Sequence, residues 1–225
     1  MPLNDYDGTT FVSFTDISGF KEMMQDRKKA GLALDGFYQA GYDILRNQTP
    51  NTHRVDGLFV SDCGVLFIRE EETEAGSPDA LNALLRVIED LSRRLLRVHV
   101  MLTSSVAYGQ FSYHQRLEFP GIEKNRFFGY AYLDAYLDNS SGHPKIQPGQ
   151  CRVVCRGLPG QLAVSGGESR LAQKRGEHRY FYWMLSDPAE IPAFDQRYGN
   201  TYLLKYKGML DALRDAAAGN LGGDA

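Results

Sequence analysis

Two aspartates stand where short apolar runs give way to turns. Asp16 closes the run 11–15 (FVSFT), and Asp62 lies in the turn SDCG between the runs 54–60 and 65–69. Runs of this kind are typical of strands, and the second and third read as a hairpin. Carboxylates are preferred ligands of Mg²⁺ and Mn²⁺, usually together with phosphates. Aspartate is also common in turns for structural reasons, so the pair alone indicates a metal site only if the two side chains converge.

The elements between the aspartates determine whether they converge. Residues 20–45 carry apolar side chains at helical spacing, which predicts two helices or one helix interrupted near 29–32. Residues 78–97 read as a helix, with Ser77 as its cap. The region 98–113 reads as a hairpin broken at Tyr108-Gly109. The order is β-α-β-β-α-β, a ferredoxin-like α+β fold in which the first and third strands are neighbours. This arrangement predicts that Asp16 and Asp62 approach each other.

The rest of the chain is expected to extend this core within a single domain, 1–225. We place the core at about 9–140, including a helix over 128–137. The sheet is predicted to continue over 150–213, with strands at 151–155, 180–185 and 199–206. The Ala- and Gly-rich tail, 214–225, is expected to fray.

Composition narrows the classes of partner. The chain has 225 residues, 43% of them hydrophobic, and a formal net charge of −3. That charge argues against nucleic acid as the main partner, which requires a basic footprint. The polar N-terminus does not resemble a signal peptide, and no apolar run reaches the roughly 18 residues of a membrane span. We therefore expect a cytoplasmic protein without a membrane partner.

Four segments together resemble the catalytic domain of class III nucleotide cyclases. FTDISGF (14–20) resembles the family's F-x-D-I-x-G-F motif, and VSDC (60–63) its I-G-D-A motif. SSVAYG (104–109) and GYAY (129–132) resemble later parts of the family pattern, in the expected order. The resemblance covers about residues 11–139.

The resemblance implies a set of roles. Asp16, the Ile17 carbonyl and Asp62 would hold two divalent metal ions, Mn²⁺ or Mg²⁺. Backbone N–H groups of Ser18, Gly19 and Phe20 would bind phosphates, and Phe14 belongs to the same nucleotide-binding motif. The family reaction is attack of the ribose 3′-hydroxyl on the α-phosphorus, releasing pyrophosphate. The family's sites form between two catalytic domains, which implies a homodimer here.

The sequence departs from purine cyclases where the base is read. Leu58 and Arg126 stand at the two purine-reading positions, and Leu133 and Leu137 stand where the family places a transition-state Asn and Arg. The pattern is similar to that of the pyrimidine nucleotide cyclases of bacterial antiphage signalling, the Pycsar system. It implies a pyrimidine triphosphate as substrate, cyclic UMP or cyclic CMP as a second messenger, and a separate effector that binds it. We favour UTP and cyclic UMP, because the donors of an arginine suit the carbonyl oxygens of uracil.

Arginines are the candidates to replace the missing groups, because a guanidinium stays charged and presents five donors. Arg54, at the start of the strand that leads to Asp62, and Arg126 are the two we select. Alternatives remain open at this point. They are an adenylate, guanylate or cytidylate cyclase with unusual residues, and a non-catalytic nucleotide-binding regulator on the same fold.

Overall fold

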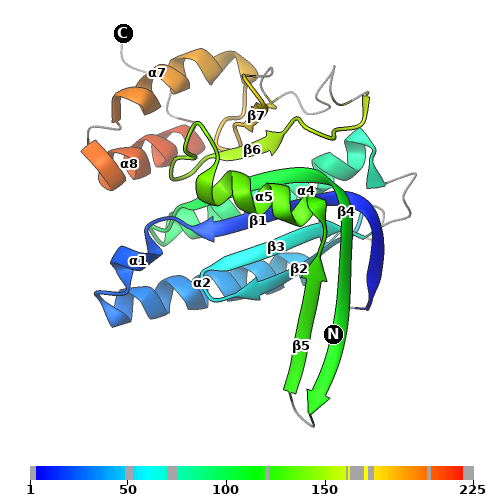
Figure 1. Cartoon of the computed structure of the whole chain (residues 1–225). Helices are drawn as coiled ribbons and strands as arrows, with labels where there is room; N and C mark the ends of the chain where they lie inside the picture. The colour runs from blue at the N-terminus through cyan, green and yellow to red at the C-terminus, as the bar shows by residue number, and fades with distance from the viewer. Residues whose placement is uncertain are drawn as a thin grey trace.

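A mixed sheet forms the centre of the computed structural model, which describes residues 4–48, 53–69, 75–119, 122–160, 162, 170–171, 175–201 and 204–219 (Figure 1). In this part of the chain the sheet has seven strands, ordered β2-β3-β1-β4-β6-β7, and β5 pairs with β4. The strands are β1 (Tyr6–Ile17), β2 (Val55–Val60), β3 (Cys63–Ile68), β4 (Leu102–Phe119), β5 (Ile122–Phe128), β6 (Cys151–Val154) and β7 (His178–Phe181). The predicted ferredoxin-like order and its C-terminal sheet extension are confirmed.

The two faces of the sheet are covered by different helices. Helices α2 (Arg27–Arg46) and α4 (Pro78–Arg97) pack on one face, in a core that includes Phe11 and Leu66. Helix α5 (Tyr130–Ser141) packs on the other face (Figure 1). Because side chains alternate along a strand, each residue of β1 belongs to one of these faces. The even-numbered residues Val12 and Phe14 face α5, and Asp16 follows them.

Local signals explain where the long helix α4 begins. The Ser77 hydroxyl accepts a hydrogen bond from the Ala80 N–H at 3.1 Å, and Pro78 occupies the first turn. Proline suits that position because its missing N–H would have no partner there. The predicted start, end and cap of this helix are confirmed.

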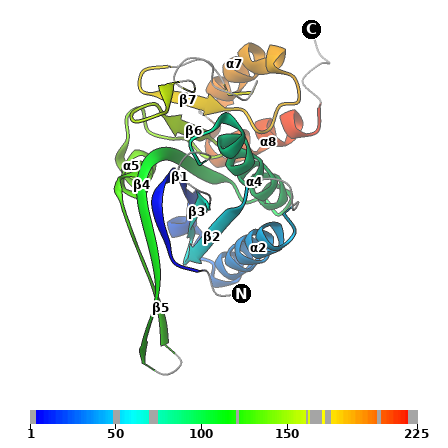
Figure 2. The same cartoon turned by 90° about the vertical axis from the view of Figure 1, so that its right-hand side faces the viewer.

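The expected break in the 98–113 region is wrong, because β4 runs through Gly109 without interruption. Gly109 pairs with Thr10 of β1, and a Cβ at this position would lie 3.4 Å from the Ala131 nitrogen of α5. The glycine therefore allows a close approach of helix to strand rather than a turn. The chain reverses between β4 and β5 instead, and this pair extends well beyond the rest of the sheet (Figures 1 and 2).

The first helical region does consist of two helices, α1 (Phe20–Met23) and α2, but they separate earlier than predicted. Asp26 ends the interruption: its carboxylate accepts the N–H groups of Lys28 and Lys29, both at 3.1 Å. An aspartate N-cap is therefore the signal that fixes the start of α2.

The strand expected at 199–206 is wrong, because its described residues, 199–201 and 204–206, belong to helical segments. After a short 3₁₀ turn η1 (Pro188–Glu190), α7 (Ile191–Thr201) and α8 (Lys205–Ala217) pack beside β6 and β7. Leu213 and Ala216 of α8 are buried, so the chain stays ordered beyond the expected start of the frayed tail at 214. Residues 220–225 lie outside the described part.

None of the helices in the described ranges combines the length and the apolar character that crossing a bilayer requires.

Candidate metal and nucleotide site

Strand pairing brings the two aspartates together. β1 and β3 are antiparallel, Asp16 pairs with Cys63, and the Ile17 N–H donates to the Asp62 carbonyl at 2.9 Å. The N–H and C=O of one residue point to the same side of an antiparallel strand, so the Ile17 carbonyl also points toward Asp62. The backbones of Asp16, Ile17 and Asp62 are therefore adjacent, as the predicted strand order requires, and their role as metal ligands stays a prediction.

The tip of the β2–β3 hairpin presents Asp62 in a tight turn. Ser61 adopts φ 54°, a left-handed conformation that is uncommon for residues other than glycine. The Cys63 thiol donates to the Val60 carbonyl at 3.1 Å and closes the turn. The hairpin therefore holds the Asp62 backbone beside the end of β1.

The electrostatics of the pair favour a bound cation. Burial, together with the neighbouring charge of Asp62, raises the pKa of Asp16 to about 7. Burial and the charges of both aspartates also raise the pKa of the Cys63 thiol to about 11, so it is protonated at neutral pH. Two carboxylates that repel each other and offer oxygen donors fit a hard divalent cation.

Within the described residues, no cluster of three or more His, Cys, Asp or Glu side chains is arranged to hold a metal. The donor set proposed from the sequence, the two carboxylates and the Ile17 carbonyl, has only two such side chains, so it is smaller than a cluster of this kind. Mg²⁺ commonly binds through one or two carboxylates and completes its shell with substrate phosphates. The donor set thus suits a metal that binds together with a nucleotide.

Helix α5 lies over the same face of the sheet as Asp16. Asn139 anchors it: its Oδ1 accepts from the Thr103 hydroxyl at 3.2 Å, and its Nδ2 donates to the Phe14 carbonyl at 3.4 Å. Thr103 is the β4 residue opposite Asp16. Asn139 therefore fixes the end of α5 close to the carboxylates, through a long-range contact that the sequence pattern does not reveal.

Aromatic side chains adjoin the pair on this face. Tyr136 meets the Phe14 ring edge-on at 5.2 Å and stacks with Tyr132 at 6.1 Å. Burial raises the pKa of Tyr132, and the nearby Cys63 adds to that effect. Phe14, predicted as a nucleotide-binding residue, is buried and packs against α5, two residues before Asp16.

The backbone N–H groups of the turn 18–20 are not all available to bind phosphates, contrary to the expectation from the sequence. The Ser18 N–H donates to the Met101 carbonyl at 2.9 Å, so it is not available to a phosphate. Gly19 has φ 73° and precedes α1, whose first N–H groups have no intrahelical acceptor. The Phe20 side chain is buried in the core, so only its backbone can contribute. Of the three residues predicted to bind phosphates, only the backbone N–H groups of Gly19 and Phe20 remain candidates.

The structure does not bring Arg54 to the aspartates of its own chain. Arg54 precedes β2, whereas Asp62 follows it, and six strand residues span about 20 Å. Its guanidinium pairs with the Asp56 carboxylate at 3.0 Å. The even sequence spacing predicted that Arg54 and Asp62 lie on one face of a strand, but they flank β2 at its opposite ends.

Arg126 lies still farther along the sheet. It pairs with His114 on β4, whereas Asp16 pairs with Thr103, so eleven residues of β4 (103 to 114) separate them. That spacing corresponds to about 35 Å along an extended strand. The exposed guanidinium lies 5.4 Å from the centre of the Phe128 ring. Arg126 can therefore meet a nucleotide held at Asp16 only from a second copy of the chain.

Leu58, Leu133 and Leu137, which stand where purine cyclases have polar residues, also have apolar neighbours in the structure. Leu58 is buried in the core beneath α5. Leu133 and Leu137 are 43% and 45% exposed, and Tyr130, on the same helix, is 71% exposed. Asp138, the residue after Leu137, pairs with the buried Arg152 at 2.7 Å. Exposed positions of α5 thus carry apolar side chains, and a cation beside this helix, Arg156, pairs with Asp134.

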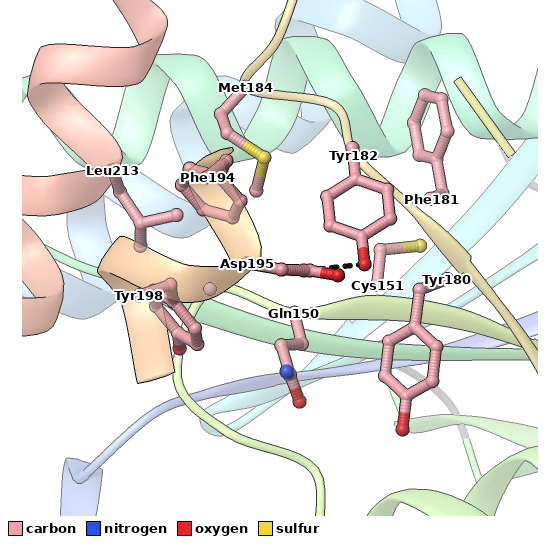
Figure 3. Close-up of a pocket in the computed structure, with 11 residues that line it drawn as sticks. Gln150, Cys151, Tyr180, Phe181, Tyr182, Met184, Phe194, Asp195, Tyr198 and Leu213 are labelled. Carbon is pink, nitrogen blue, oxygen red and sulfur yellow. Dashed lines mark hydrogen bonds between the residues drawn. The ribbon is translucent and has the colours of Figure 1, made fainter. Parts of the chain in front are cut away.

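A small cavity lies between β6, β7 and the helices α7 and α8, away from Asp16 and Asp62 (Figure 3). Its volume is about 20 Å³, which is room for about one water molecule. The Tyr182 hydroxyl donates to the Asp195 carboxylate at 2.7 Å along its wall. The cavity is too small for a nucleotide.

Known structures with this arrangement are cyclase catalytic domains. The guanylate cyclase domain of RhGC from Catenaria anguillulae, solved in complex with GTP, has a TM-score of 0.53 and 11% identity over 79% of this chain and 95% of that chain. The dimeric guanylyl cyclase domain of RhoGC from Blastocladiella emersonii has a TM-score of 0.52 and 11% identity, over 79% and 94%. The adenylyl cyclase CyaB from P. aeruginosa has a TM-score of 0.50 and 16% identity, over 68% and 79%.

The fold of this chain is therefore that of a class III cyclase catalytic domain. No family model matches the sequence, and no curated protein is significantly similar to it.

Proposed function

We propose that this protein is a nucleotide cyclase that converts UTP to 3′,5′-cyclic UMP and pyrophosphate. The observation that supports the proposal is the pairing of β1 with β3, in which Asp16 lies opposite Cys63 and the Ile17 N–H donates to the Asp62 carbonyl. Burial and the charge of Asp62 raise the pKa of Asp16, so the pair is unfavourable without a bound cation, which favours an enzyme over a non-catalytic regulator.

The chain's own residues would divide the work. Asp16, Asp62 and the Ile17 carbonyl would hold two divalent ions, Mn²⁺ or Mg²⁺. Bound there, the metals supply charge for the triphosphate and lower the pKa of the ribose 3′-hydroxyl. The free backbone N–H groups at Gly19 and Phe20 would orient the terminal phosphates. The Phe14, Tyr132 and Tyr136 rings would exclude water from the side of the site that faces α5.

A homodimer is part of the proposal. Within one chain, Arg126 lies far from Asp16, so base recognition by Arg126 requires a second copy. The exposed apolar side chains of α5, Tyr130, Leu133 and Leu137, offer a surface for that copy. The similar RhoGC domain is described as a non-canonical dimer. Arg54 would contact a nucleotide only in such an assembly.

The choice of UTP follows from hydrogen-bond chemistry. A guanidinium carries donors only. Uracil offers acceptors at O2 and O4, whereas cytosine presents a donor at N4. A donor facing a donor in a dry pocket costs about 1–3 kcal/mol, or roughly ten- to hundredfold in rate. The role in antiphage signalling, in the cytoplasm and through a separate effector, rests on the resemblance to the Pycsar cyclases.

A competition assay tests the substrate. Equal UTP, CTP, ATP and GTP are incubated with the protein and Mn²⁺, and the cyclic products are identified by mass. Cyclic UMP should dominate, and Arg126→Leu should reduce the preference for UTP over CTP about tenfold. Arg86→Leu, which removes an exposed arginine on α4, should not change it. Dominant cyclic CMP would reject the role of Arg126, and dominant cyclic AMP would reject the pyrimidine assignment.

A further inference from the structure

One side chain of the C-terminal helix α8 reaches the turn at Gly19. A Cβ placed on Gly19 would lie 4.0 Å from the Tyr206 ring. Tyr206 and Gly19 also line one open hollow of about 630 Å³ at the junction of α1 and α2. The remaining lining residues are Glu22, Met23, Gln25, Asp26 and Lys29.

A hydrogen bond from its side chain to the backbone holds Tyr206 in place. Its hydroxyl donates to the His99 carbonyl at 2.9 Å, just after α4 ends. His99 has φ 63°, a left-handed conformation that packing must maintain. Two residues later, the Met101 carbonyl accepts the Ser18 N–H at 2.9 Å. Tyr206 thus connects α8 with the segment 99–101, and that segment holds the turn 18–20.

The charges around the hollow do not make it an anion site by itself. Glu22 and Asp26 face it together with Lys29, so its lining has no excess of positive charge. The Tyr206 hydroxyl already donates to a backbone carbonyl, so it is not poised to donate to a phosphate. The contact of Tyr206 with the turn can therefore fix the position of the turn, but the Tyr206 hydroxyl does not itself bind an anion.

We propose that Tyr206 is a positioning residue, which holds the Ser18–Gly19 turn in the conformation that binds the triphosphate. Through it, the C-terminal helix α8 contributes to nucleotide affinity. This inference rests on the proposed cyclase function for its kinetic consequence, whereas the mechanical coupling of α8 to the turn stands on the contacts alone.

The test compares Tyr206→Phe with Tyr198→Phe. Tyr198, on α7, also donates its hydroxyl to a backbone carbonyl, that of Pro148, and is buried, but it lies away from Gly19. Both variants lose one hydroxyl–carbonyl hydrogen bond in the same C-terminal region. Any difference between them therefore reports the place of the bond and not its general contribution to stability.

Two readouts separate structure from function. Hydrogen exchange followed by mass spectrometry should show faster exchange of residues 17–24 in Tyr206→Phe, and no change there in Tyr198→Phe. The KM for UTP with Mn²⁺ should rise about five- to tenfold in Tyr206→Phe, with kcat within twofold of the wild type. Tyr206→Ala should show both effects more strongly, with circular dichroism confirming that it is folded.

Each outcome bears on a different claim. Unchanged exchange at 17–24 in both Tyr206 variants overturns the positioning role, whatever the activity. Faster exchange with an unchanged KM overturns the link to nucleotide affinity. A wild-type protein that forms no cyclic nucleotide from any of the four triphosphates rejects the proposed function, and the exchange result then still decides the coupling of α8 to the turn.

Discussion

Asp16 is held where its charge is unfavourable in the absence of a cation. Burial and the charge of Asp62 raise its pKa from 3.8 to about 7. The folded protein therefore binds this proton more tightly than the unfolded chain does. As pH rises from about 4 to about 7, the folded state loses stability relative to the unfolded state, and above pH 7 the loss is constant. The cation that we propose at this site would offset that loss of stability.

We predict that Asp16→Asn stabilises the metal-free protein at pH 8 but not at pH 4. Because Asp16 is partly exposed, solvent screening limits the gain to about 1–2 kcal/mol. Urea denaturation in EDTA at the two pH values measures it. An exposed aspartate on α2, changed in Asp35→Asn, serves as the control and should show no such difference. Equal stability of Asp16→Asn and wild type at both pH values would mean that Asp16 is not electrostatically strained.

At the scale of elements, two glycines of helix α2 differ in whether their surroundings leave room for a side chain. A Cβ on Gly41 would lie 2.2 Å from the Phe59 ring of β2, whereas a Cβ on Gly31 would meet nothing within 4 Å. Gly41 therefore lets the helix approach the strand that leads to Asp62. Gly31 only weakens the helix.

Gly31→Ala should stabilise the protein by about 0.5–1 kcal/mol, because alanine loses less backbone entropy in a helix. Gly41→Ala should destabilise it by about 1–3 kcal/mol, because the methyl group overpacks the contact with Phe59. Thermal unfolding of the two variants measures both effects under one set of conditions. A neutral Gly41→Ala would show that α2 and β2 are farther apart than described.

A buried ion pair fastens α5 to the C-terminal strands. The guanidinium of Arg152, fully buried on β6, donates to the Asp138 carboxylate at 2.7 and 3.0 Å. His178 of β7 and Ser105 of β4 also bond this carboxylate. Burial opposes ionisation, but the hydrogen bonds from Arg152 and Ser105 hold the pKa of Asp138 below its usual value. This network sets the position of α5 over the carboxylate pair.

Asp138→Asn should destabilise the protein by about 3–5 kcal/mol at pH 7, because it leaves the buried Arg152 without its counter-charge. The lowered pKa means that Asp138 contributes this stability above about pH 4, and that it is lost as pH falls through the folded-state pKa. The difference between variant and wild type should therefore shrink below pH 4 in denaturation experiments. A difference of the same size at pH 3 and pH 7 would contradict the ionic account.

Prediction from the sequence succeeded where local chemistry sets the structure. The turn residues around Asp62 fix the β2–β3 register, and the Ser77 cap fixes the start of α4. The pairing of β1 with β3, which brings Asp62 to the end of β1, was predicted from the order of the elements. Prediction failed where distant contacts decide. Gly109 reads as a turn residue, but it serves a close approach by α5. Tyr206 reads as part of a strand, but α8 places it against the turn at Gly19, which no local pattern encodes.

At the scale of the whole molecule, the outer face of α5 is the surface that we expect a second copy to cover. Leu133→Glu combined with Leu137→Glu should convert a dimer into a folded monomer, because it buries charge in an apolar interface. Light scattering at micromolar concentration measures the change. Leu32→Glu, at a leucine of α2 that is 63% exposed, should leave the dimer intact. A wild-type monomer with full specific activity would contradict the composite site.

The central claim is that Asp16 and Asp62 together make this chain a metal-dependent nucleotide cyclase. The most direct measurement is the mass of the products formed from each of the four nucleoside triphosphates with Mn²⁺, by the wild type, Asp16→Ala, Asp62→Ala and the control Asp35→Ala. We predict a cyclic nucleotide and pyrophosphate from the wild type and the control. Neither product should appear with the two site variants, although circular dichroism shows them folded, because each loses a metal ligand. Near-normal activity of either site variant, or no cyclic product from the wild type with any triphosphate, would contradict it.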